Sequence, residues 1–465
     1  MPKVHLLSLG CPKNLVDSEV MLGALTHAGY EITMAPDEAQ VLVINTCAFI
    51  EAAKKESIDA ILQAAEVKKR AAGRRLVVAG CLSQRYSDEL RELLPEVDIF
   101  VGTGNFLDLP DLLRTTELPE ERPAPYRGAA HLLPGADAPR ITTTSFFSSY
   151  LKISEGCNHK CAFCIIPKIR GLHESRPAEV IIEEAADLAR RGVREINLIA
   201  QDLTAYGRDL KPPSSLAMLL RGLSRIDAIR WIRLLYCYPN FVSDELLDAV
   251  AELPQVVKYI DMPLQHADDG ILRTMRRERS EAALERLLDR IRTRIPDVTL
   301  RTSFIVGFPG ETDAAFERLL DFVRRQRFDR VGVFTYSREE NTAAYDLPGQ
   351  VPARVMRARR ARLMQAQAEI SLARNQWLVG REMEVMVENY APGSQGRLRG
   401  RLAGQAPEID GMVLLRGAAE PGEFIRARIE KAFTYDLHAR VVSAGMDAQD
   451  RVDAKDLSER LAVHA

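Results

Sequence analysis

The chain has 465 residues, a net charge of −2, 46% hydrophobic residues and 28% charged residues. These values are typical of a globular protein with several domains, and they exclude a strongly charged polyelectrolyte. No apolar run approaches the roughly 18 residues of a membrane span, and the N-terminus lacks a signal segment. We therefore expect a cytoplasmic protein with no membrane partner, in which clustered cysteines indicate a metal or catalysis rather than disulfides.

The first part of the chain alternates between short apolar strands and amphipathic helices. Strands are predicted at 3–9, 40–45 and 76–79, with helices at 14–28 and 50–72. Continuous apolar strands separated by helices predict a parallel sheet that is covered on both faces.

A cysteine follows each of these three strands: Cys11, Cys47 and Cys81. A single cysteine after a strand is usually a small buried residue. The carboxyl ends of parallel strands lie along one edge of the sheet, so three cysteines in this position should converge. The pattern favours a three-cysteine [4Fe–4S] cluster with one iron left open.

Proline-rich residues between 115 and 145 show little periodicity, and we predict a domain at 1–125 followed by a linker at 126–145. A second alternation follows in a predicted domain at 146–375. Its strands are predicted at 150–153, 194–199, 230–235, 257–260, 298–306 and 331–335, with helices between them. Six such units predict an open (β/α)6 barrel in an α/β fold, with the active site at the carboxyl ends of the strands.

The loop that leaves the strand at 150–153 holds Cys157, Cys161 and Cys164 in the spacing C-x-x-x-C-x-x-C. Three thiolates can hold three irons of a four-iron cluster and leave the fourth open to a substrate. A structural zinc site usually has four ligands in two pairs, and the second pair is missing here. A disulfide would leave an odd thiol and would require an oxidising compartment, and three buried cysteines would rarely cluster within eight positions by chance.

The last part of the chain changes to a period of two. Short alternating strands with Gly and Pro turns predict a small antiparallel β-barrel at 376–443, followed by a polar tail at 444–465. Residues 377–443 contain nine basic and nine acidic side chains. RNA-binding barrels normally carry a basic excess, so this balance favours a basic protein as partner, although the run Arg397, Arg399 and Arg401 points the other way.

Nearly the whole chain resembles the methylthiotransferase family of radical S-adenosylmethionine (SAM) enzymes. LGCPKNLVDSE (9–19), NTCAFI (45–50) and AGC (79–81) resemble its N-terminal domain, and GCNHKCAFCIIPKIRG (156–171) and IVGFPGET (305–312) resemble its catalytic domain. The C-terminal barrel resembles a TRAM domain. AQDLTAYG (200–207) and APEIDG (406–411) resemble the RimO branch, which modifies an aspartate of ribosomal protein uS12, rather than the branch that modifies an adenosine of tRNA.

The resemblance implies two [4Fe–4S] clusters, SAM, uS12 as partner and an electron donor such as flavodoxin or ferredoxin; tRNA is the alternative substrate. Cofactor binding is expected at five residues near strand ends or the cysteine loop: Phe163, Gln201, Asp202, Gly307 and Gly310. Phe163 has packing of the loop as its alternative role. Gln265 and His266 are candidate catalytic residues, with a hydrogen-bonded structural role as the alternative for His266.

Overall fold

The computed structural model describes residues 1–114, 133–135, 138–391 and 397–443. The predicted tail at 444–465 and part of the predicted linker lie outside these residues. The chain divides into two compact units, Met1–Gln367 and Ala368–Ala465, which are treated separately below. No helix in the described part is long and apolar enough to cross a membrane.

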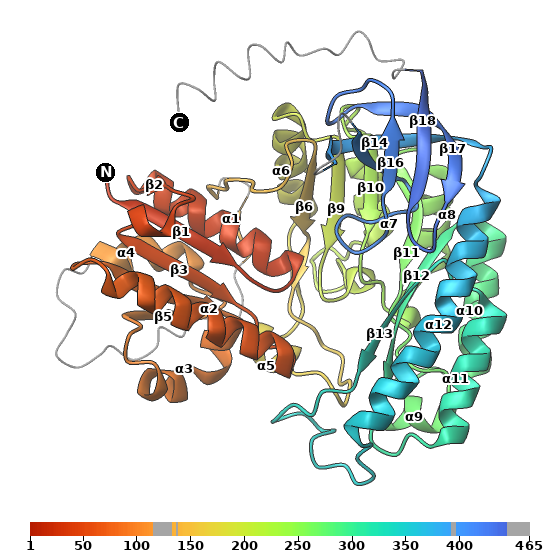
Figure 1. Cartoon of the computed structure of the whole chain (residues 1–465), viewed down its shortest axis with the longest axis horizontal. Coiled ribbons are helices and arrows are strands. Elements are labelled where there is room, and N and C mark those ends of the chain that lie inside the picture. Colours follow the sequence, from red (N-terminus) through yellow and green to blue (C-terminus); the bar gives the residue numbers. More distant parts are fainter. Residues whose placement is uncertain (115–132, 136–137, 392–396, 444–465) are drawn as a thin grey trace. The chain divides into compact units, whose positions relative to one another are not determined.

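The N-terminal part of the first unit is a five-stranded parallel sheet in the order β2-β1-β3-β4-β5 (Figure 1). The strands are β1 (Lys3–Ser8), β2 (Glu31–Ile32), β3 (Val41–Thr46), β4 (Arg75–Gly80) and β5 (Ile99–Val101). The helices are α1 (Pro12–His27), α2 (Glu51–Lys69), α3 (Cys81–Leu93) and α4 (Leu109–Arg114), with 3-10 turns at Pro36–Glu38 and Phe106–Asp108. The predicted parallel α/β domain is therefore confirmed.

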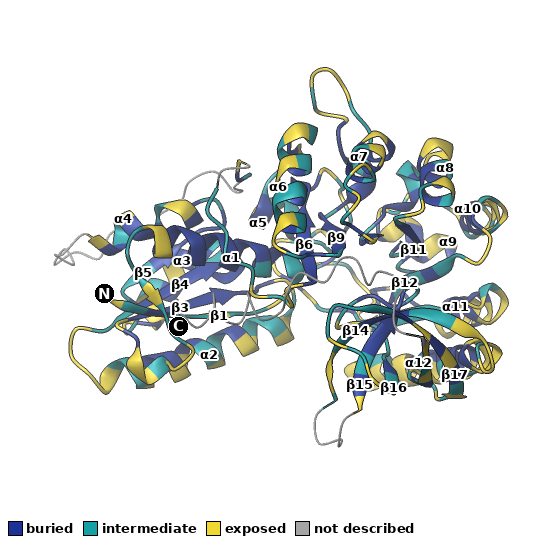
Figure 2. Ribbon diagram, turned by 90° about the horizontal axis from the view of Figure 1, so that it is seen from above, coloured by how far each residue is buried: buried dark blue, intermediate teal, exposed yellow. Residues whose placement is uncertain are grey.

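Strands β3 and β4 show why this sheet needs helices on both faces. Leu42 and Ile44 point into one apolar cluster, and Val41 and Val43 into another. Because side chains alternate across a strand, a strand that is apolar at every position must be covered on both sides. Figure 2 shows these strands as buried and the outward face of α2 as exposed.

The second part of this unit is a six-stranded parallel sheet in the order β13-β12-β11-β10-β9-β6. Its strands are β6 (Ser148–Lys152), β9 (Glu195–Ile199), β10 (Trp231–Leu234), β11 (Val256–Asp261), β12 (Thr299–Val306) and β13 (Arg330–Thr335). The main helices are α6 (Ala178–Arg190), α7 (Leu216–Leu223), α8 (Asp244–Glu252), α10 (Glu281–Arg294), α11 (Asp313–Gln326) and α12 (Ala353–Trp377). The end strands β6 and β13 do not pair with each other, so the predicted open six-stranded barrel is confirmed.

Several elements are not predicted by the sequence pattern, and all of them except the 13-residue helix α3 are short. They are β2, β5, α3, α4, α5 (Ile166–Arg170), α9 (Asp269–Thr274), the two-stranded pair β7 (Ser154–Glu155) and β8 (Glu174–Ser175), and 3-10 turns at Leu203–Ala205 and Pro239–Phe241. The end of the predicted linker also packs more closely than a free linker would. A side chain at Gly23 would meet the carbonyl oxygen of Pro139 at 2.3 Å, and Arg140 pairs with Glu19 and Glu184.

The second unit contains a closed barrel in the order β14-β15-β16-β18-β17. Its strands are β14 (Glu382–Tyr390), β15 (Leu398–Leu402), β16 (Val413–Arg416), β17 (Phe424–Ala432) and β18 (Leu437–Ser443). The barrel is confirmed, but the expectation of a wholly antiparallel one is wrong at one pair, because β16 and β18 run parallel. An alternating apolar pattern predicts strands and their inward faces, whereas the relative direction of two paired strands depends on the segments that connect them.

Candidate functional site: two cysteine sets linked by buried charges

Cys11, Cys47 and Cys81 all lie at the carboxyl edge of the N-terminal sheet. Cys11 precedes helix α1 as its N-cap residue, Cys47 directly follows β3, and Cys81 is the first residue of α3. The thiols are close enough to act on one another electrostatically, since Cys11 and Cys47 each raise the pKa of Cys81. The structure therefore brings together three cysteines that are spread over 70 positions of the sequence.

Two glycines allow this convergence. Gly10 and Gly80 have φ values of 91° and 93°, in the region that favours glycine. A side chain at Gly10 would meet the Cβ atom of Cys47 at 2.7 Å, and one at Gly80 would meet the Thr46 carbonyl oxygen at 2.7 Å. Any larger residue would push the first or third cysteine away from the second.

Polar side chains brace the loops that carry these cysteines. Asn14 donates from Nδ2 to the carbonyl oxygens of Leu9 (2.9 Å) and Thr46 (2.8 Å). Ser57 Oγ accepts from the Cys47 amide at 3.0 Å and donates to the Cys47 carbonyl oxygen at 2.9 Å. These bonds tie Cys47 to helix α2 and the β1 and β3 ends to α1.

Cys157, Cys161 and Cys164 lie on the loop between β7 and α5. Gly156 has a φ of 76°, and a side chain there would meet the Leu172 carbonyl oxygen at 2.0 Å. The amide of Cys157 donates to the Gly171 carbonyl oxygen at 3.1 Å, which closes the base of the loop. The thiols again interact, because Cys157 and Cys161 raise the pKa of Cys164.

Burial raises the pKa of several of these thiols: that of Cys81 to about 12, that of Cys157 to about 11 and that of Cys164 to about 12. Burial also raises the pKa of Cys47. Free thiols in these places stay protonated at neutral pH. A bound metal must supply the positive charge that makes them thiolates, so metal binding here releases protons.

No group of three or more His, Cys, Asp or Glu side chains in the described residues is arranged to hold a single metal ion. A four-iron cluster holds its cysteines farther apart than one ion does. Each set supplies three soft sulfur ligands and no His or carboxylate, which is the donor chemistry of iron–sulfur clusters. The residues present therefore fit two three-cysteine clusters.

A buried ionic network extends from one cysteine set to the other. Arg170, at the end of α5, donates to Asp17 at 2.6 Å and to Glu155 at 3.2 Å, and it also donates to Asn14 Oδ1. Lys152 pairs with the same two carboxylates, at 2.6 and 2.8 Å. Burial by itself would raise the pKa of Glu155, but Lys152 and Arg170 outweigh it and lower that pKa to about 2. Asp17 and Asn14 belong to the N-terminal domain, so this network holds the two α/β domains together.

A second group of side chains contacts the cysteine loop from the segments that follow strands β9 and β10 and helix α9. His159 Nε2 lies 2.7 Å from Asp202 Oδ2, and its ring stacks on that of Tyr238 at a centroid distance of 3.7 Å. Arg277 lies over the other side of this region: its Nη1 is 3.4 Å from Cys161 Sγ, and its guanidinium is 4.3 Å from the Tyr238 ring centroid.

The predicted cofactor residues at the end of β9 are already bonded to protein groups. Asp202 accepts from His159 with one oxygen and from the Thr204 amide (2.8 Å) and hydroxyl (2.5 Å) with the other. Gln201 donates to Glu155, while its Oε1 is buried without a partner. Phe163 packs against an apolar cluster that includes Phe308. These contacts favour positioning of the cysteine loop over direct cofactor contact for Asp202 and Phe163, and leave Gln201 with a free acceptor.

The two candidate catalytic residues, Gln265 and His266, follow strand β11 and differ in their surroundings. Gln265 has a φ of 75° and forms a bridge with Phe304; a non-glycine residue in this region is typical of functional sites. His266 is fully buried, and its Nδ1 accepts from the Asp268 amide at 3.0 Å. Its Nε2 lies 3.8 Å from Glu311 Oε1, and neither atom has a hydrogen-bond partner.

The Gly307–Gly310 turn rests on this buried pair. Glu311 accepts from the Gly307 amide through its other oxygen, and a side chain at Gly307 would meet Met356. Gly310 has open space where a side chain would point, so the turn leaves room there for a ligand. The contacts of His266 are thus with residues that support the turn.

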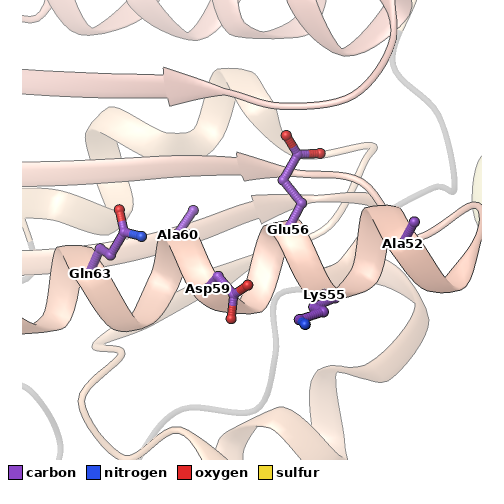
Figure 3. Close-up of a pocket in the computed structure, with 6 residues that line it drawn as sticks. All are labelled: Ala52, Lys55, Glu56, Asp59, Ala60 and Gln63. Atoms are coloured by element: carbon purple, nitrogen blue, oxygen red, sulfur yellow. The ribbon is translucent and has the colours of Figure 1, made fainter.

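A surface hollow on α2 lies outside this arrangement (Figure 3). It is lined by Ala52, Lys55, Glu56, Asp59, Ala60 and Gln63. All six residues come from a single helix, and no strand end contributes to the hollow, so it lacks the convergent groups of a catalytic site.

Three family models match the chain. Residues 3–102 match the uncharacterized protein family UPF0004, residues 151–323 the radical SAM superfamily and residues 379–442 the TRAM domain. An open sheet of six parallel strands, with a C-x-x-x-C-x-x-C loop after its first strand, defines the class of radical SAM enzymes.

Comparison with curated relatives identifies one family within this class. A ribosomal protein uS12 methylthiotransferase RimO from Myxococcus xanthus is 48% identical over 97% of this chain and 94% of its own. The protein of the same name from Geobacter sulfurreducens is 48% identical over 95% and 99%. The chain belongs to the ribosomal protein uS12 methylthiotransferase family.

Solved structures share the fold at low sequence identity. The radical SAM methyltransferase TsrM from Kitasatospora setae aligns with a TM-score of 0.55 at 14% identity, over 74% of each chain. The cobalamin-dependent radical SAM enzyme OxsB aligns with a TM-score of 0.51 at 13% identity, over 80% of this chain and 56% of its own.

Sequence reasoning missed most of the polar residues around the cysteines. They are Lys13, Asn14, Asp17, Ser57, Lys152, Glu155, His159, Arg170, Tyr236, Tyr238 and Arg277. A charged residue inside or beside an apolar strand, as at Lys152 and Glu155, is a usable signal, because such a residue is buried only with a partner. Nothing in the local sequence identifies Arg277 as a neighbour of Cys161.

Proposed function

We propose that the chain replaces a hydrogen on the β-carbon of an aspartate in ribosomal protein uS12 with a methylthio group. The observation that carries this proposal is the presence of two separate three-cysteine sets at strand ends, joined by one buried ionic network. A single set would suffice for radical formation. A second set with its own open iron fits a reaction that also delivers sulfur.

The cysteines are assigned as ligands: Cys157, Cys161 and Cys164 for the cluster that binds SAM, and Cys11, Cys47 and Cys81 for the auxiliary cluster. When bound and reduced, the first cluster with SAM supplies a radical that removes hydrogen from an unactivated carbon, and the second holds the sulfur. The side chains and turns of the protein shape the cofactor site and orient the molecules that bind there. The Gly307–Gly310 turn leaves room for a ligand at the end of β12, and Gln201 offers a free acceptor at the end of β9.

We assign one role to each predicted domain: sulfur delivery to residues 1–125, radical formation to residues 146–375 and substrate docking to residues 376–443. A one-electron donor of the flavodoxin or ferredoxin type is the proposed reductant. We place the reaction in the cytoplasm, where uS12 and the small ribosomal subunit are made.

A tRNA substrate is the alternative, and the barrel argues against it. The arginine run that suggested RNA binding is partly neutralised, because Arg401 donates to Glu388 at 2.5 Å and Arg399 lies 3.8 Å from the same carboxylate, while Arg397 is exposed. Arg401 is also buried. An RNA-binding surface needs exposed and unpaired positive charge.

Mass spectrometry of uS12 and of bulk tRNA from a deletion strain tests the proposal. The methylthio mass should disappear from uS12, persist on tRNA, and return with the wild-type gene but not with a Cys157→Ala gene. Loss of the modification from tRNA with uS12 unchanged would overturn it.

A further inference from the structure

Lys13 is an exception among the buried cations of the described residues. Seven lysines and arginines there have less than a tenth of their surface exposed: Lys13, Lys152, Arg170, Arg176, Arg233, Arg359 and Arg401. All except Lys13 form an ion pair with a carboxylate. The ammonium of Lys13 is instead held against an aromatic ring, 3.5 Å from the centroid of Tyr236.

A buried charge without a counter-ion is costly, and a cation over a ring keeps most of its capacity to bind an anion. The carboxylates nearest in the network are already engaged: Asp17 and Glu155 each accept from both Lys152 and Arg170. Asp261, whose carboxylate accepts from the Tyr236 amide, pairs with Arg301. No carboxylate of the described residues forms an ion pair with Lys13, so a bound substrate can supply the anion that it lacks.

The position of Lys13 points to the reacting end of the substrate. It is two residues from Cys11, in the first turn of the 16-residue helix α1, where helix geometry also favours an anion. Its ring partner Tyr236 lies two residues after the carboxyl end of β10, with a φ of 72°, and Gln265 follows the neighbouring strand β11 with a φ of 75°. Lys13 thus joins the loop of the auxiliary cysteines to the strand ends of the radical domain.

We propose that Lys13 binds the side-chain carboxylate of the substrate aspartate, an inference that rests on the proposed function. The carbon that receives sulfur is bonded directly to that carboxylate. Any residue that recognises the carboxylate must then lie beside both the sulfur and the radical, and Lys13 is the buried cation without an anion at that place among the residues described. An adenosine offers no anion at its reacting carbon, so the same residue selects protein over tRNA.

The test compares uS12 carrying aspartate at the modified position with uS12 carrying asparagine there. Dissociation constants are measured for whichever form of uS12, free or in the small subunit, the wild-type enzyme modifies. Wild type should bind the aspartate form about 10- to 100-fold more tightly, the value of a buried hydrogen bond to a charged group. Lys13→Met should bind both forms alike, and Lys13→Arg should keep most of the preference.

The ratio within one variant does not depend on how much of the protein is folded, and iron content per chain checks the clusters separately. Lys55→Met is the matched control, because Lys55 lies on the exposed face of α2 (Figure 3), and it should bind as wild type does. Tyr236→Leu, which removes the ring and keeps the ammonium, should reduce the preference.

Two results would overturn the inference while leaving the proposed function intact. One is a Lys13→Met enzyme that still prefers aspartate as strongly as wild type. The other is a shifted reduction potential of the auxiliary cluster in Lys13→Met with the preference unchanged, which would make Lys13 a counter-ion of the cluster. A wild-type enzyme that modifies no uS12 would overturn the proposed function and this inference together.

Discussion

Nη2 of Arg170 lies 3.4 Å from Sγ of Cys81, and the same guanidinium pairs with Asp17 and Glu155. Arg170 ends the short helix that begins just after Cys164, while Cys81 belongs to the other cysteine set. One side chain from the helix that follows the radical loop therefore donates to a proposed ligand of the auxiliary cluster.

We expect Arg170→Gln to lower the reduction potential of the auxiliary cluster. A hydrogen bond and a positive charge beside a ligand sulfur stabilise the reduced cluster, which is the more negative form. Their loss should shift the potential by on the order of 50 mV, where about 59 mV is a tenfold change for one electron. EPR-monitored titration in a Cys157/Cys161/Cys164→Ala background isolates this cluster.

Arg277 provides the matched control, because its Nη1 is also 3.4 Å from a ligand sulfur, that of Cys161. In a Cys11/Cys47/Cys81→Ala background, Arg277→Gln should lower the potential of the SAM-binding cluster. Each substitution should leave the other cluster unchanged. A shift of the SAM-binding cluster by Arg170→Gln, without a shift of the auxiliary one, would contradict the assignment.

Each of the two cysteine sets should bind its iron–sulfur cluster independently of the other. Anaerobically reconstituted wild type should contain about eight irons per chain, and each triple Cys→Ala variant about four. Cys237→Ala is the control: Cys237 is buried after β10, outside both sets, and its removal should leave eight. Four irons in wild type, unchanged in the Cys11/Cys47/Cys81→Ala variant, would rule out two clusters.

The elements that carry the cysteines are predictable from the sequence because their signals are local. An apolar strand such as Val41–Thr46 and the position of Cys47 behind it follow from hydrophobic pattern and sheet topology. The same reasoning finds the six strands of the radical domain and three of the five barrel strands, β14, β17 and β18, but not the short strands β15 and β16.

The partners of the cysteines are not predictable in this way. Arg170 and Cys81 are 89 positions apart, and Lys152 and Asp17 are 135 apart. No local period encodes such pairs, since they arise only when two domains pack. His266 shows a related limit: a His at a strand tip is compatible with catalysis or with a structural role, and the sequence does not show that the side chain is buried with its Nδ1 bonded to the Asp268 amide.

The buried pair behind this turn gives a separate prediction. We expect Glu311→Gln to raise the KM for SAM about tenfold, because an amide is a weaker acceptor than a carboxylate for the Gly307 N–H bond that shapes the turn. The rate constant at saturating SAM and the iron content should change little. His266→Gln should act in the same direction. A large fall in kcat with an unchanged KM would instead make these residues catalytic.

The ion pairs of Glu339 with Lys54 and Arg85 give a pH dependence at the contact between the α/β domains. The Glu339 side chain is 2% exposed and lies 3.1 Å from Lys54 and 2.9 Å from Arg85. Burial opposes ionisation, but hydrogen bonds from Ser337, Lys54 and Arg85 outweigh it and lower the pKa of Glu339 below the usual 4.5. The unfolded chain then takes up a proton before the folded chain does, so this stabilisation is complete above pH about 4.5 and is lost as the pH falls further.

Glu339→Gln should therefore destabilise the protein by about 3 kcal/mol near neutral pH, because it leaves two largely buried cations without their carboxylate. The difference in unfolding midpoint between wild type and variant should stay constant from pH 6 to about 4.5 and should shrink as the pH falls from there towards about 3. Glu66→Gln is the control, since the Glu66–Lys69 pair is exposed on both sides and its loss should have little effect at either pH. If the difference in unfolding midpoint between wild type and Glu339→Gln stayed constant below pH about 4.5 as well, the stabilisation would not come from the ionised carboxylate.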